Sequence, residues 1–189
     1  MKHLFFILLI ALLCSACMKD RIIDQVPAAN GTLPNPDSSG TYPPQLNEFM
    51  ASNTSTIANP DTAGVALFND WIEIYNPNDK EIDIAGYYLT DSLPNPQKFQ
   101  FTTGSAKTKI PAKGYLLIWC DNYSSLGPLH TTFSLSKSGE SIGLANPSGN
   151  LIDSFVYGMQ TSDVSMARTP NGGSLWQTCS NPTPGGINP

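Results

Sequence analysis

Apolar and polar residues alternate in short runs through most of the chain after residue 44. No stretch keeps apolar residues at the i, i+3, i+4, i+7 spacing over the dozen or so residues that a helix needs. Clusters of Pro, Gly, Asn, Asp and Ser separate the runs, as turns separate strands. The pattern predicts strands at residues 46–50, 70–76, 82–91, 98–101, 115–120, 132–136, 141–145, 151–157 and 164–168. We therefore expect an all-β sandwich or barrel of about 8–10 short strands.

The run at 70–76 indicates a strand in the middle of such a sandwich. Ile72 and Ile74 share one face of this strand, while Trp71, Glu73 and Tyr75 share the other. Because both faces are largely apolar, Glu73 would be partly buried and would need a partner. Two arginines occur in the whole chain, Arg21 and Arg168, and Arg21 lies outside the strand-forming region. We therefore predict a structural ion pair between Glu73 and Arg168.

Two further features of this region shape the expected fold. Gly86 interrupts the run at 82–91, which predicts a bend or bulge there. The 19 residues from 51 to 69 form a long connection rich in Ser, Thr, Asn and Ala. Loops of that length are usually functional or mobile.

The first residues have the organisation of a secretory signal peptide. Lys2 precedes ten apolar residues at 4–13, and small residues follow before Cys17. Ten apolar residues are too few to span a bilayer as a helix. The tripeptide at 15–17, Ser-Ala-Cys, resembles the end of a bacterial lipobox, although Cys14 stands where Leu is usual. We expect removal of residues 1–16 and lipid attachment at Cys17, which would anchor the protein to a membrane.

The segment after the expected anchor differs from the rest of the chain. Residues 18–44 are dominated by Pro, Gly, Ser and Asn and show no lasting apolar period. This composition predicts a disordered linker. The expected organisation is a signal peptide at 1–16, a lipid-anchored linker at 17–44 and a folded domain at 45–189.

Charge and cysteine content narrow the functional classes. The chain has 10 basic and 15 acidic side chains, and the signal contains one basic residue and no acid, so the remainder carries 9 − 15 = −6. This balance argues against a general nucleic-acid binder, which would show a basic patch.

Cys120 and Cys179 remain after export. They form either a disulfide, which an oxidising compartment permits, or two separate thiols.

One short motif raises the question of catalysis. Residues 139–143, GESIG, fit the nucleophile elbow of serine hydrolases with Ser141 as the nucleophile. An elbow joins a strand to a helix, whereas the alternating flanks here predict a hairpin that turns at 137–139. His3 leaves with the signal and His130 precedes Ser141. We therefore expect no catalytic residue, and a serine hydrolase is the disfavoured alternative.

Metal and cofactor sites are not indicated either. One histidine and two scattered thiols do not make a zinc site, and no EF-hand pattern is present. The Asn and Asp residues at 76–79 and 121–122 fit turn chemistry. Aromatic residues such as Trp71, Trp119 and Tyr88 leave open a glycan-binding platform, although strand aromatics more often pack in a core.

An ordered set of motifs resembles the lamin tail domain in its bacterial form. The set consists of LNEF at 46–49, DWIEIYNP at 70–77, IDIAGYYLTD at 82–91, IPAKGYLLIWCDN at 110–122, LHTTFSLSKSGESIGLANPSGNLIDSF at 129–155, SMARTPNGG at 165–173 and PTPGGIN at 182–188. The resemblance covers residues 45–189 and implies an immunoglobulin-like β-sandwich. It also implies a non-catalytic accessory module, and it makes the GE pair at 139–140 part of a family hairpin.

These observations together predict a non-catalytic lipoprotein of the cell envelope. We expect an outer-membrane lipoprotein that faces outward and displays a lamin-tail-type interaction module for a protein or glycan partner. The alternative is a glycan-binding accessory lipoprotein. No cofactor, metal or nucleic-acid partner is expected.

Overall fold

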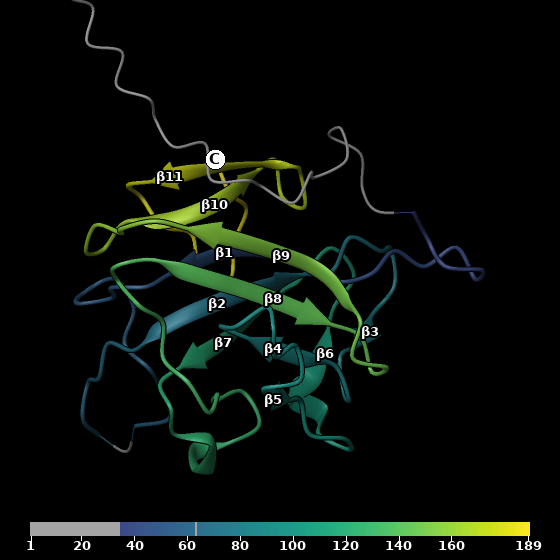
Figure 1. Ribbon diagram of the computed structural model, residues 1–189, viewed down its shortest axis with the longest axis horizontal. Helices are drawn as coiled ribbons and strands as arrows, with labels where there is room; N and C mark the ends of the chain where they lie inside the picture. Colours follow the sequence, from purple (N-terminus) through teal and green to yellow (C-terminus); the bar gives the residue numbers. More distant parts are fainter. Residues whose placement is uncertain (1–34, 63) are drawn as a thin grey trace, which may run out of the picture.

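The computed structural model describes residues 35–62 and 64–189, which form an all-β, immunoglobulin-like sandwich (Figure 1). The strands are β1 (Gln45–Met50), β2 (Asp70–Tyr75), β3 (Ile82–Asp83), β4 (Tyr88–Thr90), β5 (Phe99–Gln100), β6 (Lys109–Ile110), β7 (Tyr115–Cys120), β8 (Glu140–Ala145), β9 (Leu151–Tyr157), β10 (Ser165–Thr169) and β11 (Leu175–Cys179). Two short 3-10 helices, η1 (Ala106–Thr108) and η2 (Ser124–Leu126), lie in the connections. In this part of the chain no helix is long and apolar enough to cross a membrane.

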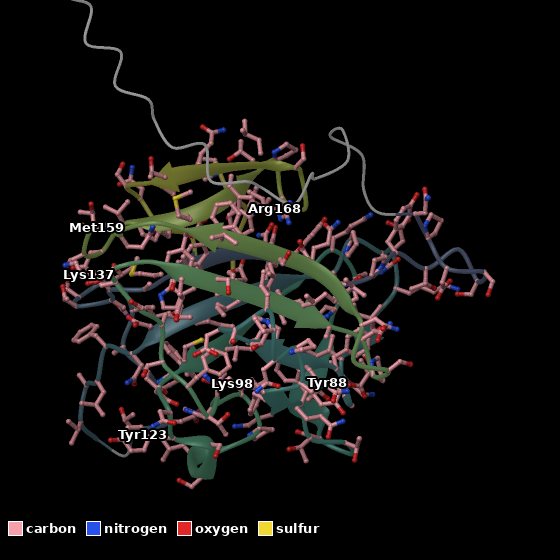
Figure 2. The ribbon with its side chains drawn as sticks, viewed as in Figure 1. Tyr88, Lys98, Tyr123, Lys137, Met159 and Arg168 are labelled. Atoms are coloured by element: carbon pink, nitrogen blue, oxygen red, sulfur yellow. The ribbon has the colours of Figure 1, made fainter. Side chains whose placement is uncertain are left out.

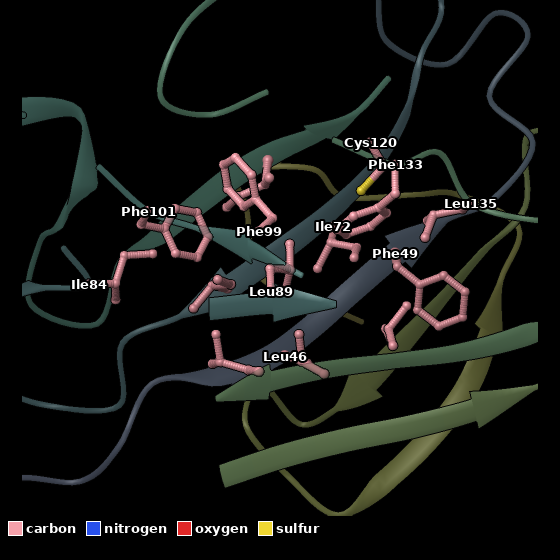
Figure 3. Close-up of a cluster of buried hydrophobic side chains, with 14 of the residues drawn as sticks. Leu46, Phe49, Ile72, Ile84, Leu89, Phe99, Phe101, Cys120, Phe133 and Leu135 are labelled. Atoms are coloured by element: carbon pink, nitrogen blue, oxygen red, sulfur yellow. The ribbon is translucent and has the colours of Figure 1, made fainter. Parts of the chain in front are cut away.

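Two antiparallel sheets pack face to face. One has five strands in the order β11-β10-β1-β2-β7, and the other has four in the order β5-β4-β8-β9. A small third sheet pairs β3 with β6. The core between the sheets is aliphatic and aromatic (Figure 3), and its largest fully buried members include Phe49, Phe101, Leu46, Ile72, Ile84 and Leu89. The two sheets thus share one hydrophobic interior.

The alternation predicted for β2 is confirmed. Ile72 and Ile74 belong to the core between the sheets, whereas Trp71 packs in a separate cluster with Met50 and Trp119. In β1, Leu46 and Phe49 both belong to the main core although three positions separate them. A register shift between Leu46 and Glu48 allows this, because a bulge inserts one extra residue into the strand.

The outer face of the five-stranded sheet is also covered. Ile57, from the connection at 51–69, packs on the cluster of Met50, Trp71 and Trp119. Residues 180–189 form hydrogen bonds to β1 and β2 and cover the next part of the same face. These ten residues are called the C-terminal strap below. Their coverage explains why Glu48 and Glu73 on this face are 0% exposed.

The structure differs from the predicted strands in three places. Residues 132–136 form no regular strand. Phe133 and Leu135 enter the core, and the only ladder contact is a bridge between Asp121 and Ser134. The run at 82–91 divides into β3 and β4 around Gly86, whose φ of 83° favours glycine, so the predicted bend is confirmed. The pattern missed β6, which has two residues, and β11, which lies between turn residues on both sides.

Candidate functional site

The predicted ion pair between Glu73 and Arg168 is wrong. Arg168 points between the sheets, where its Nη2 lies 2.7 Å from Asp153 Oδ1 on β9. Its Nε donates to the Leu46 carbonyl oxygen at 2.6 Å, and its guanidinium lies over the Trp176 ring. Glu73 lies on the opposite face of the five-stranded sheet. The alternation of side chains across a strand therefore separates the two groups.

Glu73 belongs to a buried acidic pair beneath the C-terminal strap. Glu48 and Glu73 face each other across β1 and β2. The strap holds both carboxylates: Thr183 donates its N–H and hydroxyl to Glu48, and Gly185 donates its N–H to Glu73 Oε2 at 2.6 Å. The side-chain amide of Asn47 donates to Glu73 Oε1 at 2.8 Å. The Thr-Pro-Gly sequence of the strap thus supplies part of the donors that this pair requires, together with Asn47 and Ser165.

No cation contacts this pair within the described part of the chain, and the acidity of Glu73 reflects that. Burial raises the pKa of Glu73 to about 7. The hydrogen bonds from Asn47 and Gly185 lower it, and the neighbouring Glu48 raises it further. The carboxyl therefore titrates near neutral pH. The sequence predicted the burial of Glu73, which causes this shift, but not the shift itself.

Polar contacts around His130 and Asp163 help to fix the long connection at 51–69 to the rest of the domain. His130 is 1% exposed, and its two ring nitrogens lie 2.7 Å from Asp121 Oδ2 and 3.1 Å from Asp61 Oδ2. Asp163 accepts hydrogen bonds from the backbone and hydroxyl groups of residues 54–56. The hydroxyl of Thr54 and these backbone donors hold the pKa of Asp163 well below its usual range. Both contacts join segments far apart in the sequence.

Ser141 does not lie in a nucleophile elbow. It belongs to β8, which pairs with β4 and β9, and no helix follows it. Its hydroxyl donates to the Asp91 carbonyl oxygen at 3.4 Å. The turn at 137–138 is present, but the predicted hairpin with residues 132–136 is wrong, because β8 forms its hairpin with β9. Both ring nitrogens of His130 lie against carboxylates, those of Asp121 and Asp61.

The two cysteines are separate, buried thiols. Cys120 lies on β7 and Cys179 on β11, which form opposite edges of the five-stranded sheet. Four strand spacings of about 4.8 Å separate the edges by roughly 19 Å. A disulfide requires Cα atoms within about 7 Å, so the thiol alternative holds and the disulfide is wrong. Cys17, the predicted site of lipid attachment, lies outside the described residues.

The Asn and Asp turns and the strand aromatic residues have structural roles. Among residues 35–62 and 64–189, no group of three His, Cys, Asp or Glu side chains could hold a metal ion. Asn76 instead organises turns, with its amide donating to the carbonyl oxygens of Lys80, Ile110 and Pro111. Trp71 and Trp119 are 0% and 4% exposed, so they pack in the interior and form no aromatic platform.

An open groove that sequence reasoning missed lies beside β5. It encloses about 540 Å³, and its lining residues are Lys98, Phe99, Gln100, Thr102, Thr103, Gly104, Ser105, Ser124, Gly127, Pro128 and Thr132. Five of the lining residues carry a hydroxyl group and Gln100 carries an amide, and Lys98 is neutralised by Asp91 at 2.6 Å. Tyr123, next to the groove residue Ser124 in the chain, is 59% exposed (Figure 2). The lining comes from three sequence segments, so no single motif could have revealed it.

Comparisons with known proteins bear on the whole domain. Residues 38–159 match the family model of the Lamin Tail Domain. Neither a curated protein nor a solved structure matches the chain. β10, β11 and the C-terminal strap follow the matched range, yet they complete the five-stranded sheet and cover its outer face. The match spans more than half of the sequence, and the chain belongs to the lamin tail domain family.

Proposed function

We propose that this chain is a non-catalytic, lipid-anchored protein of the cell envelope that displays its lamin tail domain as an interaction module. The observation that supports the proposal most directly is the family itself, whose members share a non-catalytic immunoglobulin-like module. The signal-like residues 1–16 and the cysteine at position 17 suggest the anchor. An outer-membrane position with the domain facing outward completes the proposal.

The absence of catalysis is testable at Ser141. Its position in a paired strand and its bond to the Asp91 carbonyl give it no activating base. Incubation of the purified protein with a fluorophosphonate probe should therefore leave Ser141 unlabelled, at the level of a Ser141→Ala control. Stoichiometric labelling of Ser141 in the folded protein would show that the chain is a hydrolase.

The anchor is testable by detergent-phase partition of the full-length protein expressed in bacteria. Cys17→Ala should move the protein from the detergent phase to the aqueous phase, because lipid attachment would be lost. Cys14→Ala is the matched control and should stay in the detergent phase. The reverse pattern would place the lipid on Cys14, and aqueous partition of the wild-type chain would reject the anchor altogether.

Whether the partner is a protein or a glycan is the next question. Crosslinking on intact cells should join the displayed domain to a protein partner, since we propose an interaction module. The hydroxyl-lined groove favours a second candidate, binding of a neutral glycan, because sugars are recognised by such polar groups beside an aromatic side chain. A glycan array that gives a signal abolished by Thr132→Arg in the groove would support this second candidate over the first.

A further inference from the structure

The two sheets of the sandwich have unequal widths. The five-stranded sheet ends with β10 and β11, whereas the four-stranded sheet ends with β9. Side chains of β9 contact β1 and β10. The ring centroids of Phe155 and Phe49 lie 6.0 Å apart, and Asp153 pairs with Arg168. In Figure 1, β10 and β11 extend beyond the free edge of β9. The four-stranded sheet thus ends short of β11.

The inner face of β11 is only partly covered. Trp176 and Thr178 lie on this face, because their partners Arg168 and Met166 on β10 point between the sheets. The Trp176 ring stacks on Phe155 with centroids 4.5 Å apart and remains partly exposed, and Thr178 is exposed. A strand added to β9 would lie over these two side chains.

β9 and β11 are both open edges in the described part of the chain, and β9 is the longer of the two, with seven residues against five. The outer edge of β7 is occupied, since Trp119 exchanges backbone hydrogen bonds with Leu129 and Thr131. The opposite end of the four-stranded sheet is β5, which has two residues. β9 has seven residues with no lysine or proline, the residues that usually block strand addition. Its one charged residue, Asp153, already has a partner.

The shape and charge of this place define its occupant. Two copies could not pair through their β9 edges, because each β11 extends past β9 into the space that the other copy's sheet would need. The free edge and the faces of Trp176 and Thr178 present no unpaired charge, which favours an uncharged segment with alternating apolar and hydroxyl side chains. We infer that the outer edge of β9 binds one extended segment of a partner protein, which adds as a fifth strand and lies over β11. This inference rests on the proposed interaction function and specifies its surface.

The test uses the full mature chain and heptapeptides selected against it from a phage-displayed library. Hydrogen exchange measured with and without a selected peptide should show slowed exchange of the β9 amides at 151–157. Thr178→Arg places a long cation on the inner face of β11 and should weaken peptide binding by at least about tenfold. Gln177→Arg is the matched control, because Gln177 is also exposed but lies on the other face of β11, and binding should be unchanged.

Four results would overturn the inference. The β9 amides in the free chain could already exchange as slowly as those of β8, which would mean that another segment of this chain covers the edge. Selected peptides could leave the exchange of 151–157 unchanged, or Thr178→Arg and Gln177→Arg could have equal effects. A cell-surface partner crosslinked at the groove of 98–132 without protection of β9 would reject this edge and still support the proposed interaction function.

Discussion

Acidic side chains lie against both faces of the five-stranded sheet, Asp153 of β9 on the inner face and Glu48 and Glu73 on the outer face, and they are compensated in different ways. On the inner face, Asp153 lies 2.7 Å from the guanidinium of Arg168. On the outer face, Glu48 and Glu73 receive hydrogen bonds from neutral groups, including Thr183 and Gly185 of the C-terminal strap. The inner site contains a cation, whereas the outer site contains only neutral hydrogen-bond donors.

The difference determines what each site responds to. An ion pair fails when one partner is removed, because the other charge is then buried without compensation. A carboxylate held by neutral donors keeps a desolvation cost, which appears as the raised pKa of Glu73. We therefore expect the inner site to be sensitive to mutation and the outer site to be sensitive to pH and to the strap.

The largest effect should follow from Arg168→Met on the inner face. The variant keeps much of the side chain's apolar length but removes the guanidinium that donates to Asp153 Oδ1 and to the Leu46 carbonyl oxygen, so that the Leu46 N–H remains as a donor to Asp153 without a cation beside it. Loss of one partner of a buried pair costs roughly 3–5 kcal/mol, so the free energy of unfolding in urea should fall by that order. Asp153→Asn with Arg168→Met should recover part of the loss. A single Arg168→Met change that costs under about 1 kcal/mol would show that Asp153 needs no cation.

The next effect is a loss of stability as pH rises, caused by Glu73. Its pKa is about 7 in the folded protein and 4.5 in the unfolded reference. The stabilising contribution is complete below pH 4.5 and is lost as pH rises through 7, since ionisation then favours the unfolded chain. The shift of about 2.5 pKa units corresponds to roughly 3 kcal/mol.

Denaturation of the wild-type chain and of Glu73→Gln between pH 4.5 and 8 measures this term. The variant should show a flatter dependence on pH. Burial also raises the pKa of Asp70 to about 6, so the wild-type slope contains a second contribution that persists in the variant. Parallel pH profiles for the two proteins would remove Glu73 as the titrating group.

The same comparison shows what the sequence could reveal. The alternation at 70–76 was sufficient to predict that Glu73 is buried, because that conclusion depends on local periodicity alone. The partner of Arg168 could not be predicted, because Asp153 reaches it from the opposite sheet and only the sheet order brings β9 over β10. The family motif at 182–188 was visible as a pattern, but its role as donor to Glu48 and Glu73 required the folded chain.

A smaller effect is expected from the strap itself. Thr183→Val preserves the shape of the side chain but removes the hydroxyl that donates to Glu48 Oε2 at 3.0 Å and contacts Asn188 Oδ1 at 3.0 Å. Leaving a buried carboxylate with one fewer donor should cost about 1–3 kcal/mol. Hydrogen exchange should accelerate within residues 180–189, while β9 and β10 should remain unchanged. Faster exchange throughout the domain would mean that the strap is part of the global folding unit.

The smallest expected effect is the coupling between Glu73 and Arg168, which the structure places on opposite faces of one sheet. Neither side chain shares a hydrogen-bond partner with the other: Arg168 contacts Asp153, Leu46 and Gly173, and Glu73 contacts Asn47 and Gly185. A double-mutant cycle of Glu73→Gln and Arg168→Met should therefore give an interaction free energy within about 0.5 kcal/mol of zero. The cycle of Asp153→Asn and Arg168→Met should give a clearly larger value in the same denaturant assay. Equal coupling in both cycles would contradict the separation of the two sites. The Asn188 side chain donates to the carbonyl oxygens of Asn47 and Arg168, and it would then be the route by which a change at one site affects the other.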